Sequence, residues 1–338
     1  MRFGIQLGTY LPGDWTPAET FRHVELLAEA AHRHGFDGLF SGHRYLAGKQ
    51  TALLQPFVLL GHLSGLCKGM FLGTSIYLLP LHNPVESAEQ AATLDILCEG
   101  KFLFGIGLGY QDFEFKAFGV EKRQRRKRAL ESVQVMRRLW DEDDVTHHGE
   151  FFSLEGATIN PKPHRRPGPP ILVGADTIEA VRGAPELGDH WLPSRRHSKT
   201  FLREALPVYK AALAARGRAF QGLPMYRDLV VAETAALAQE RVRPAYQAMY
   251  QAFSRMGHPG EHYNLDFEEL KRERLLLGSP EEVAEQVLDY HREFGVEFMW
   301  FAVQWPGMAT QAALETIRLF GDEVIPRVQR ETGPSRLP

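Results

Sequence analysis

The amino-acid sequence predicts an α/β fold, a TIM-type (β/α)8 barrel. Two observations lead to this prediction. Eight short apolar runs alternate with amphipathic stretches of helical spacing, and the runs are continuously apolar, as in strands that are covered on both faces. Parallel strands joined by right-handed crossovers can close into a ring that has no free edge. The length of 338 residues fits one such barrel, so a second domain is not required.

The predicted strands are short, and each ends at or beside a residue that interrupts regular structure or is polar. In chain order they are FGIQLG (3–8), GLFS (38–41), FLGTSIYLL (71–79), FLFGIGLG (102–109), ILVGA (171–175), DHWLP (189–193), YRDLVVAE (226–233) and VEFMWFAV (296–303).

The helices between these strands are predicted from their start and stop signals. A start signal with a capping residue, a proline at the first helical position and a glutamate two residues later occurs three times, as TPAE (16–19), NPVE (83–86) and SPEE (279–282). The capping side chain satisfies a free backbone N–H, and the glutamate can reach back to the cap. These helical stretches end at the glycines Gly35, Gly100 and Gly295, which suit the left-handed conformation that ends a helix.

Two segments break the alternation of strands and helices. Residues 145–170, after the fourth helix, contain THHGEFFSLEG and a proline-rich run, and residues 256–274, before the eighth strand, contain GHPGEHYN. Both are expected to be insertions into a single barrel domain of residues 1–330, which is followed by a C-terminal tail of residues 331–338.

The composition points to a globular enzyme with small-molecule partners. The chain is 44% hydrophobic and 24% charged with a formal net charge of -3, which gives no reason to expect nucleic acid or an anionic membrane as partner. Its two cysteines lack a C-x-x-C spacing, its start lacks a signal-peptide pattern, and no apolar run approaches the ~20 residues of a membrane span. We therefore expect a cytoplasmic protein that binds neither membrane nor nucleic acid.

Residues just after each strand are the candidates for chemistry, because the strand ends of a barrel meet at one mouth. They are Tyr10, His43, Arg44, Thr74, Ser75, Ile76, Gly107, Tyr110, Gly174, Ala175, Asp176, Thr177, Trp191, Arg195, Arg196, Gln304 and Trp305. Imidazole titrates near neutral pH, so His43 could act as a base or a hydrogen-bond donor, although a histidine that only caps a strand is equally consistent with its position.

Two glycine-containing motifs bear on cofactor binding. GIGLGY (105–110) lacks the third glycine of a dinucleotide fingerprint, because Tyr110 occupies that place, but its glycines still permit close approach of a flat ring or a phosphate. VGADTIEA (173–180) ends a strand and starts a helix, so its free N–H groups and the Thr177 hydroxyl could cradle a phosphate. The charge of Asp176 opposes this unless it serves only as the cap of the helix.

Other motifs give no further site. The basic run KRQRRKR (122–128) opens a helix of regular apolar spacing and is interpreted as a solvated helix face. The pairs His32 with His34 and His147 with His148 lack the spacing of a zinc site, so no metal is predicted.

Together these motifs resemble the bacterial luciferase-like flavin-dependent monooxygenase superfamily, over nearly the whole chain from FGIQLG to GDEVIPRV. The most specific stretch is LGTSIYLLPLHNPVESAEQAATLDILCEGKFLFGIGLGYQDFEFKAFGV (72–120). Supporting segments are FSGHRY, VGADTIEAVRGAPELGDHWL, LLLGSPEEVAEQV and FAVQWPGM.

The resemblance implies a mechanism. Reduced FMN from a separate flavin reductase would react with O2 to give a flavin hydroperoxide, which oxygenates a small organic substrate. The resemblance also implies a cis peptide bond at Ser75–Ile76 under the flavin ring and a homodimer. His43 takes the place of the catalytic histidine. Thr74, Ser75, Ile76, Gly107 and Tyr110 are assigned to the ring site, Gly174, Ala175, Asp176 and Thr177 to the phosphate loop, and Tyr10, Arg44, Trp191, Arg195 and Trp305 to the substrate pocket.

Two departures from the family keep alternatives open. Many flavin-using members pair the phosphate with an arginine where this chain has Leu108, so Arg195 or Arg196 could supply the charge instead. The residue after His43 is often a second histidine, and here it is Arg44. The alternatives are a deazaflavin-dependent dehydrogenase or reductase on the same fold, and a non-catalytic flavin-binding protein.

Overall fold

The computed structural model describes residues 1–8, 11–49, 51–255 and 265–337. Its centre is a nine-stranded sheet of order β10-β9-β6-β5-β3-β1-β13-β11-β12, in which every strand pair is parallel. The strands are β1 (Arg2–Leu7), β3 (Gly38–Ser41), β5 (Phe71–Leu78), β6 (Phe102–Gly107), β9 (Ile171–Gly174), β10 (His190–Leu192), β11 (Leu223–Val231), β12 (Leu275–Gly278) and β13 (Val296–Ala302). All eight predicted strands are present, and β12 is an additional one.

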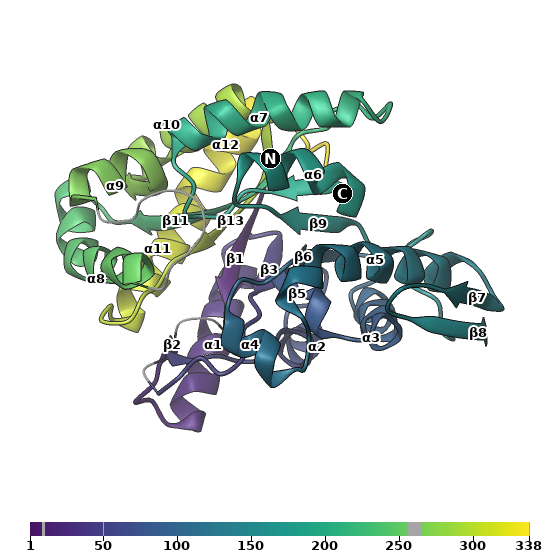
Figure 1. Ribbon diagram of the computed structural model, residues 1–338. Coiled ribbons are helices and arrows are strands. Elements are labelled where there is room, and N and C mark those ends of the chain that lie inside the picture. Colours follow the sequence, from purple (N-terminus) through teal and green to yellow (C-terminus); the bar gives the residue numbers. More distant parts are fainter. Residues whose placement is uncertain (9–10, 50, 256–264, 338) are drawn as a thin grey trace.

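Helices surround the sheet (Figure 1). They are α1 (Pro17–Arg33), α2 (Pro56–Leu66), α3 (Pro84–Leu97), α4 (Asp112–Ala117), α5 (Arg125–Asp141), α6 (Ile178–Leu187), α7 (Lys199–Ala214), α8 (Ala235–Arg255), α9 (Phe267–Arg274), α10 (Pro280–Phe294), α11 (Thr310–Leu319) and α12 (Ile325–Thr332). The three predicted start signals are confirmed: Thr16 and Ser279 form capping boxes, and the Asn83 side chain accepts the Val85 amide. In the described ranges, none of the helices has the length and apolar character needed to cross a bilayer.

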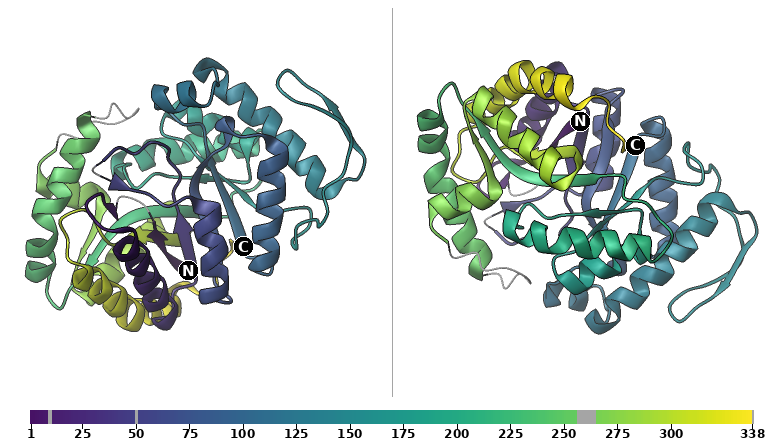
Figure 2. Two further views of the ribbon diagram at one scale, coloured as in Figure 1. Left: turned by 90° about the horizontal axis from the view of Figure 1, so that it is seen from below. Right: turned by 90° about the horizontal axis from the view of Figure 1, so that it is seen from above.

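The sheet curls, but in the described part of the chain no strand ladder joins β10 to β11, which differs from the closed ring that the sequence predicts (Figure 2). The short strand β10 gives the reason. It has three residues and is followed by Pro193, which has no N–H with which to extend a ladder. A side chain spans the gap instead: Arg227 Nη1 on β11 donates to the carbonyl oxygens of Ser194, at 3.1 Å, and Arg195, at 3.2 Å.

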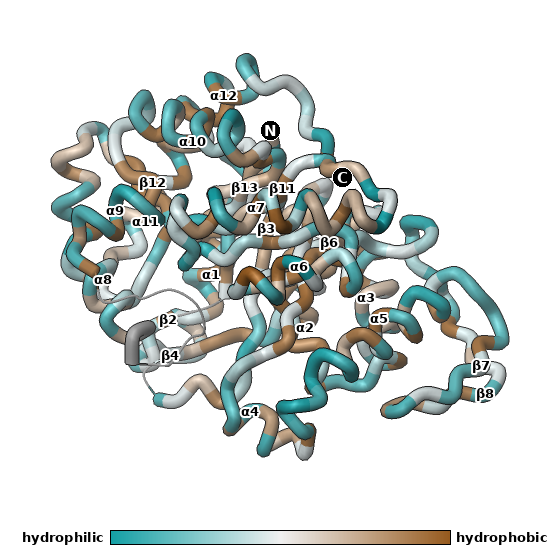
Figure 3. Tube along the Cα trace, turned by 45° about the horizontal axis from the view of Figure 1, so that its top comes forward, coloured by the Kyte–Doolittle hydropathy of each residue, from teal (hydrophilic) through white to brown (hydrophobic). Residues whose placement is uncertain are grey.

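Apolar side chains fill the inside of the curled sheet, and the strands form a hydrophobic centre under more polar helices (Figure 3). The interior cluster consists of Phe40, Leu103, Leu172, Leu192, Phe298, Trp300 and Leu337. The rings of Phe40 and Trp300 stack with centroids 4.0 Å apart. Leu337 belongs to the segment predicted as a tail, and its carbonyl oxygen accepts a hydrogen bond of 2.9 Å from Arg2 Nη1 at the start of β1. The end of the chain therefore covers the amino-terminal side of the sheet.

Strand β5 contains a bulge, and the peptide bond between Ser75 and Ile76 is cis, as the resemblance predicts. The register between β5 and β6 shifts between Thr74 and Tyr77. Glycines on β6 make room for the bulge: a Cβ at Gly105 would lie 1.9 Å from the Thr74 carbonyl oxygen, and one at Gly107 would lie 2.4 Å from Ile76 Cδ1. The space that these glycines leave is thus occupied by the neighbouring strand.

The two predicted insertions differ in how much of them is described. Residues 145–170 form an antiparallel hairpin of β7 (Val145–His148) and β8 (Ser153–Ala157), which projects beside α5 (Figures 1 and 2), followed by a proline-rich connection. In the segment 256–274, residues 256–264 lie outside the described residues, and the remainder ends in α9. A two-stranded pair of β2 (Leu11–Pro12) and β4 (Thr51–Ala52) lies on the connections after β1 and β3.

Candidate active site

A cavity of about 1370 Å³, including the part open to solvent, lies at the carboxyl ends of the strands. Its walls come from the strands β1, β5 and β11 and from the connections that follow β3, β6, β9 and β10, which include α4, α5 and α6. The predicted site residues among those that line it are His43, Arg44, Ser75, Ile76, Gly107, Tyr110, Gly174, Ala175, Asp176, Thr177, Arg195 and Arg196. Residues of four separate connections thus converge at the strand ends, as predicted, together with side chains of the strands themselves.

Five predicted site residues are not in this wall. One is Gln304, which follows β13 and lines an adjoining cavity. Thr74 is fully buried, and its hydroxyl donates to the Gly105 carbonyl oxygen at 2.7 Å, so it fastens the bulge instead of facing the cavity. Trp191 is a core residue whose Nε1 donates to the Ala175 carbonyl oxygen at 3.2 Å, which supports the β9–α6 connection from behind. Trp305 packs edge-on against Tyr246 in a separate cluster. Tyr10 lies outside the described residues.

His43 is 4% exposed and lies against the bulge. Its backbone N–H donates to the Ile76 carbonyl oxygen at 3.1 Å, and its Nδ1 accepts the Leu78 amide at 3.3 Å. The acceptor role of Nδ1 places the proton of the neutral ring on Nε2. Burial, and to a lesser extent the neighbouring His82, lower the pKa of His43 to about 3, while a hydrogen bond with Gln55 acts in the opposite direction. His43 is therefore a neutral imidazole whose Nε2–H is available as a donor.

Aromatic rings hold His43 in place. Tyr77 stacks on it with centroids 4.8 Å apart, Tyr45 meets it edge-on at 4.5 Å, and His82 stacks at 5.3 Å. The Tyr45 hydroxyl and His82 Nε2 are 3.3 Å apart. Burial also lowers the pKa of His82 to about 4. The cluster is neutral near pH 7 and fixes the orientation of the imidazole.

The bulge itself forms part of the cavity floor. Ser75 and Ile76 both line the cavity, and the Ser75 hydroxyl accepts a hydrogen bond of 3.0 Å from Trp300 Nε1 on β13. A Cβ at Gly174 would come within 3.3 Å of Ile76 Cγ2, so β9 approaches the bulge closely. The bulge thus presents one apolar side chain and one hydroxyl to the cavity.

The start of α6 places groups that could bind an anion at one end of the cavity. Thr177 is the N-cap, and its hydroxyl oxygen accepts the Ala180 amide at 3.2 Å, which leaves the hydroxyl hydrogen free to donate. Helix N-termini present unpaired N–H groups and a positive dipole end. Asp176 does not cap the helix. Its carboxylate pairs with Arg196 at 3.4 Å and His197 at 3.2 Å, which offsets its repulsion of an anion.

Arg195 is almost fully buried and forms an ion pair of 2.6 Å with the fully buried Asp228. The Tyr246 hydroxyl donates to the same carboxylate at 3.0 Å. Arg195 and Arg196 each face a carboxylate. Neither therefore replaces the phosphate-binding arginine that many flavin-using members have at the position of Leu108.

The structure brings two charged residues into the cavity that the sequence argument did not assign to it. Arg125, at the first position of α5, lines the same cavity as Thr177 at the start of α6. The basic run was interpreted as a solvated face, which holds for the exposed side chain of Arg123, but helix geometry turns Arg125 inward. Glu114 on α4 is 2% exposed, and burial raises its pKa while the Tyr45 amide, at 2.9 Å, and Arg44 lower it.

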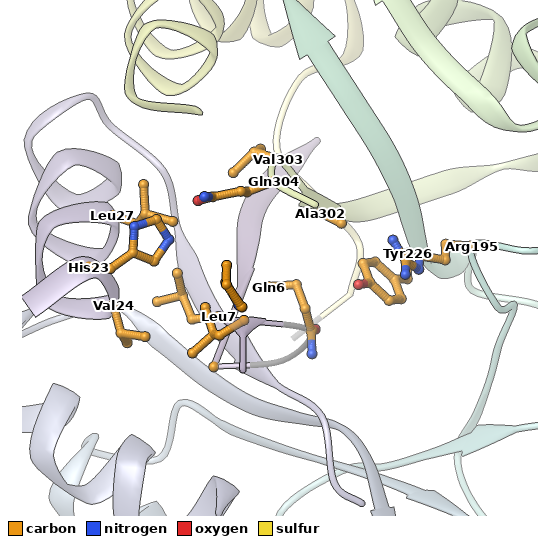
Figure 4. Close-up of a pocket in the computed structure, with 13 residues that line it drawn as sticks. Gln6, Leu7, His23, Val24, Leu27, Arg195, Tyr226, Ala302, Val303 and Gln304 are labelled. Carbon is orange, nitrogen blue, oxygen red and sulfur yellow. The ribbon is translucent and has the colours of Figure 1, made fainter. Parts of the chain in front are cut away.

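A smaller cavity of about 480 Å³, including the part open to solvent, adjoins the large one between β1, α1 and the connection after β13 (Figure 4). Gln6, Arg195 and Tyr226 line both cavities. His23 and Gln304 lie on the far side of Gln6 from Tyr226 in this view. In the parts of the chain that the structure describes, no group of three or more potential metal ligands occurs.

Comparisons with known proteins bear on this site. The model of a family described as luciferase-like monooxygenase matches residues 1–297. The crystal structure of monooxygenase RslO1 from Streptomyces bottropensis superposes with a TM-score of 0.86 at 25% identity and covers 97% of this chain and 99% of that one. An F420-dependent glucose-6-phosphate dehydrogenase from Segniliparus rotundus is 25% identical over 331 residues, 92% of this chain and 96% of its own length. An FMNH2-dependent dimethylsulfone monooxygenase from Pseudomonas putida is 28% identical over 197 residues, 57% of this chain and 54% of its own length.

Proposed function

The chain belongs to the luciferase-like monooxygenase family, and we propose that it is a flavin-dependent monooxygenase that uses reduced FMN and O2 to oxygenate a small organic substrate. A separate flavin reductase would supply the reduced FMN. The observation that carries the proposal is the large cavity itself, whose wall contains both the bulge at Ser75 and Ile76 and the helix start at Thr177.

The cavity suits the parts of FMN. The phosphate would lie at the N-terminus of α6, held by the Thr177 hydroxyl, by N–H groups of the helix start and by Arg125, which takes over the charge that Leu108 cannot supply. The isoalloxazine ring would lie against Ile76, next to His43.

Bound reduced FMN supplies the reaction with oxygen, and the protein supplies position, hydrogen bonds and exclusion of water. His43 would donate a hydrogen bond from Nε2–H to an oxygen at the reactive face of the ring. Because the pKa of its imidazolium form is about 3, the ring is neutral over the whole working range. It keeps its Nε2–H and acts as a hydrogen-bond donor, not as a general acid. The Tyr45 and Tyr77 rings keep the imidazole from rotating.

The alternative is a deazaflavin-dependent dehydrogenase or reductase on the same fold. The relative from Segniliparus rotundus favours it, because the match extends over nearly the full length of both chains. The relatives named for monooxygenase activity favour the oxygenase, and the structural similarity to RslO1 extends over nearly all of both chains as well. A fold shared by both reactions cannot choose between them.

The deciding experiment measures both reactions with one preparation of enzyme. Reduced FMN with O2 and reduced deazaflavin without O2 are each supplied with a panel of small organic substrates. If the proposal is right, oxygen is incorporated into a substrate in the arm with reduced FMN and O2 and not in the arm with deazaflavin. The His43→Ala variant should lose this activity. Turnover only with deazaflavin would establish the alternative, and tight flavin binding without turnover in either arm would indicate a non-catalytic flavin-binding protein.

Arg125 provides a separate test of the cofactor pose. A charge-assisted hydrogen bond contributes roughly 1.5–3 kcal/mol, so Arg125→Gln should weaken the binding of FMN by about 10- to 100-fold. The matched control is Arg123→Gln in the same basic run, whose side chain is 83% exposed. Binding of riboflavin, which lacks the phosphate, should be unaffected by either substitution. Equal FMN affinity in both variants would contradict the assignment of the phosphate to the α6 end.

A further inference from the structure

We infer that Glu114 is a specificity-determining residue of the large cavity, where one of its carboxylate oxygens accepts a hydrogen bond from an uncharged donor of the substrate, a hydroxyl or an N–H group. The inference rests on the proposed function in that the rest of the substrate would lie beside the flavin. It assigns a substrate class: small, mostly apolar molecules that carry a neutral hydrogen-bond donor.

The two carboxylate oxygens of Glu114 have different surroundings. The side chain is 2% exposed and lines the large cavity from α4. Oε1 accepts the Tyr45 backbone N–H at 2.9 Å. Within the described part of the chain no hydrogen bond reaches Oε2, and this oxygen is not among the fully enclosed polar atoms that lack a partner. Oε2 is therefore an acceptor that remains open to the cavity.

Occupation of the cavity makes this oxygen selective. Water can hydrate Oε2 while the cavity is empty, but a substrate that fills the space displaces this water. A buried carboxylate oxygen without a donor is strongly unfavourable. A substrate that brings a donor to Oε2 therefore binds, and an analogue of the same shape without the donor is rejected because the oxygen then stays unpaired.

The neighbouring charges favour an uncharged donor. Burial raises the pKa of Glu114, whereas the Tyr45 amide and the positive charge of Arg44 lower it. These two neighbours favour the ionised form of the carboxyl group, which can only accept hydrogen bonds. Arg44 lines the same cavity. An ammonium group at Glu114 would meet the like charge of Arg44, and an anionic group would meet the carboxylate itself.

Apolar side chains around α4 suit an apolar body of the substrate. Ile76 and Leu78 belong to the hydrophobic cluster of Phe115, the residue after Glu114. Both also line the large cavity, as does Tyr110, which precedes α4. A planar or aliphatic body could pack on these side chains while its donor reaches Oε2.

The test measures binding without flavin or oxygen. A protein that oxygenates no substrate could still show the expected preference, so failure of the inference and failure of the proposed function are distinguishable. The probes are 5-fluoroindole and 5-fluorobenzofuran, which have nearly the same shape, but the first has an N–H donor where the second has a ring oxygen. Titration followed by 19F line broadening gives both affinities. Wild type is expected to bind the indole about tenfold more tightly.

Glu114→Gln replaces the acceptor by a donor of nearly the same shape. The Tyr45 N–H should hold the amide oxygen at the place of Oε1, which turns the NH2 group toward the cavity. The preference for the indole should be lost, while the thermal midpoint stays close to that of wild type because the bond to Tyr45 is kept. The matched control is Glu121→Gln after α4, whose side chain is 67% exposed and which should retain the preference.

Three results would overturn the inference. The first is equal affinity of wild type for the two probes, or a preference for the benzofuran, which would make Glu114 a protonated donor. The second is a preference for the indole that persists in Glu114→Gln. The third is loss of folding in Glu114→Gln, because the fold itself would then require the carboxylate.

Discussion

Acidification should destabilise the protein through His43. The free imidazole in the unfolded chain takes up a proton as the pH falls below 6.5, whereas folded His43 does so only near pH 3 because burial disfavours its charged form. Between these values the unfolded state binds more protons, so the free energy of unfolding falls with pH. The contribution is fully present above pH 6.5 and is lost progressively toward pH 3.

The expected size follows from the shift. Each pH unit in this window is equivalent to about 1.4 kcal/mol, so His43 should account for about 2 kcal/mol of lost stability at pH 5 relative to pH 7.5. Urea unfolding at both pH values, followed by tryptophan fluorescence and far-UV circular dichroism, measures it. His43→Gln should lessen the pH dependence by about this amount, and His32→Gln on the exposed face of α1 serves as the matched control. An unchanged pH dependence in His43→Gln would refute the assignment of a buried neutral imidazole.

Two further predictions concern stability. Asp228→Asn should lower the free energy of unfolding by roughly 3–5 kcal/mol, because it leaves the buried Arg195 without its counter-charge, and urea titration would detect it; a change below 1 kcal/mol would indicate that water reaches the pair. Gly105→Ala should destabilise the fold and abolish FMN binding, because its Cβ would lie 1.9 Å from the Thr74 backbone oxygen, whereas Gly61→Ala on α2, where no atom lies within 4 Å, should be neutral or stabilising in the same thermal melts.

The fold follows closely from local patterns in the sequence. Each continuous apolar run becomes a strand of the parallel sheet, and the Thr16 and Ser279 capping boxes begin helices where predicted. What the patterns could not supply depends on neighbours in space. Strand β12 has only four residues and directly follows α9, so its apolar run resembles the end of a helix. The missing ladder between β10 and β11 reflects the short length of β10 and the proline that follows it. The hydrophobic pattern of the sequence does not reveal whether two strands pair.

The site was predicted less completely than the fold, because position after a strand does not determine where a side chain points. Thr74 follows the rule in sequence, but its hydroxyl turns to the Gly105 carbonyl oxygen. Arg195 and Arg196 reach the mouth, yet each meets a carboxylate contributed by another element. Arg125 was hidden in a run of exposed basic residues. Arg123 lies in the 3-10 turn before α5, whereas Arg125 opens the helix and lines the cavity.

The order of strands around the mouth gives the proposed ligands an order as well. The helix start at Thr177 follows β9, the bulge at Ile76 belongs to β5 with β6 between them, and the smaller cavity lies beyond, where β1 meets β13. Charge falls in the same sequence, from the helix dipole and Arg125 at one end to neutral amides at the other. A molecule that is anionic at one end and planar in the middle can bind in only one direction across such a gradient. The neutral end, where β1 meets β13, is then left for a second, uncharged molecule. The arrangement of the strands would thus determine on which side of the flavin the substrate binds.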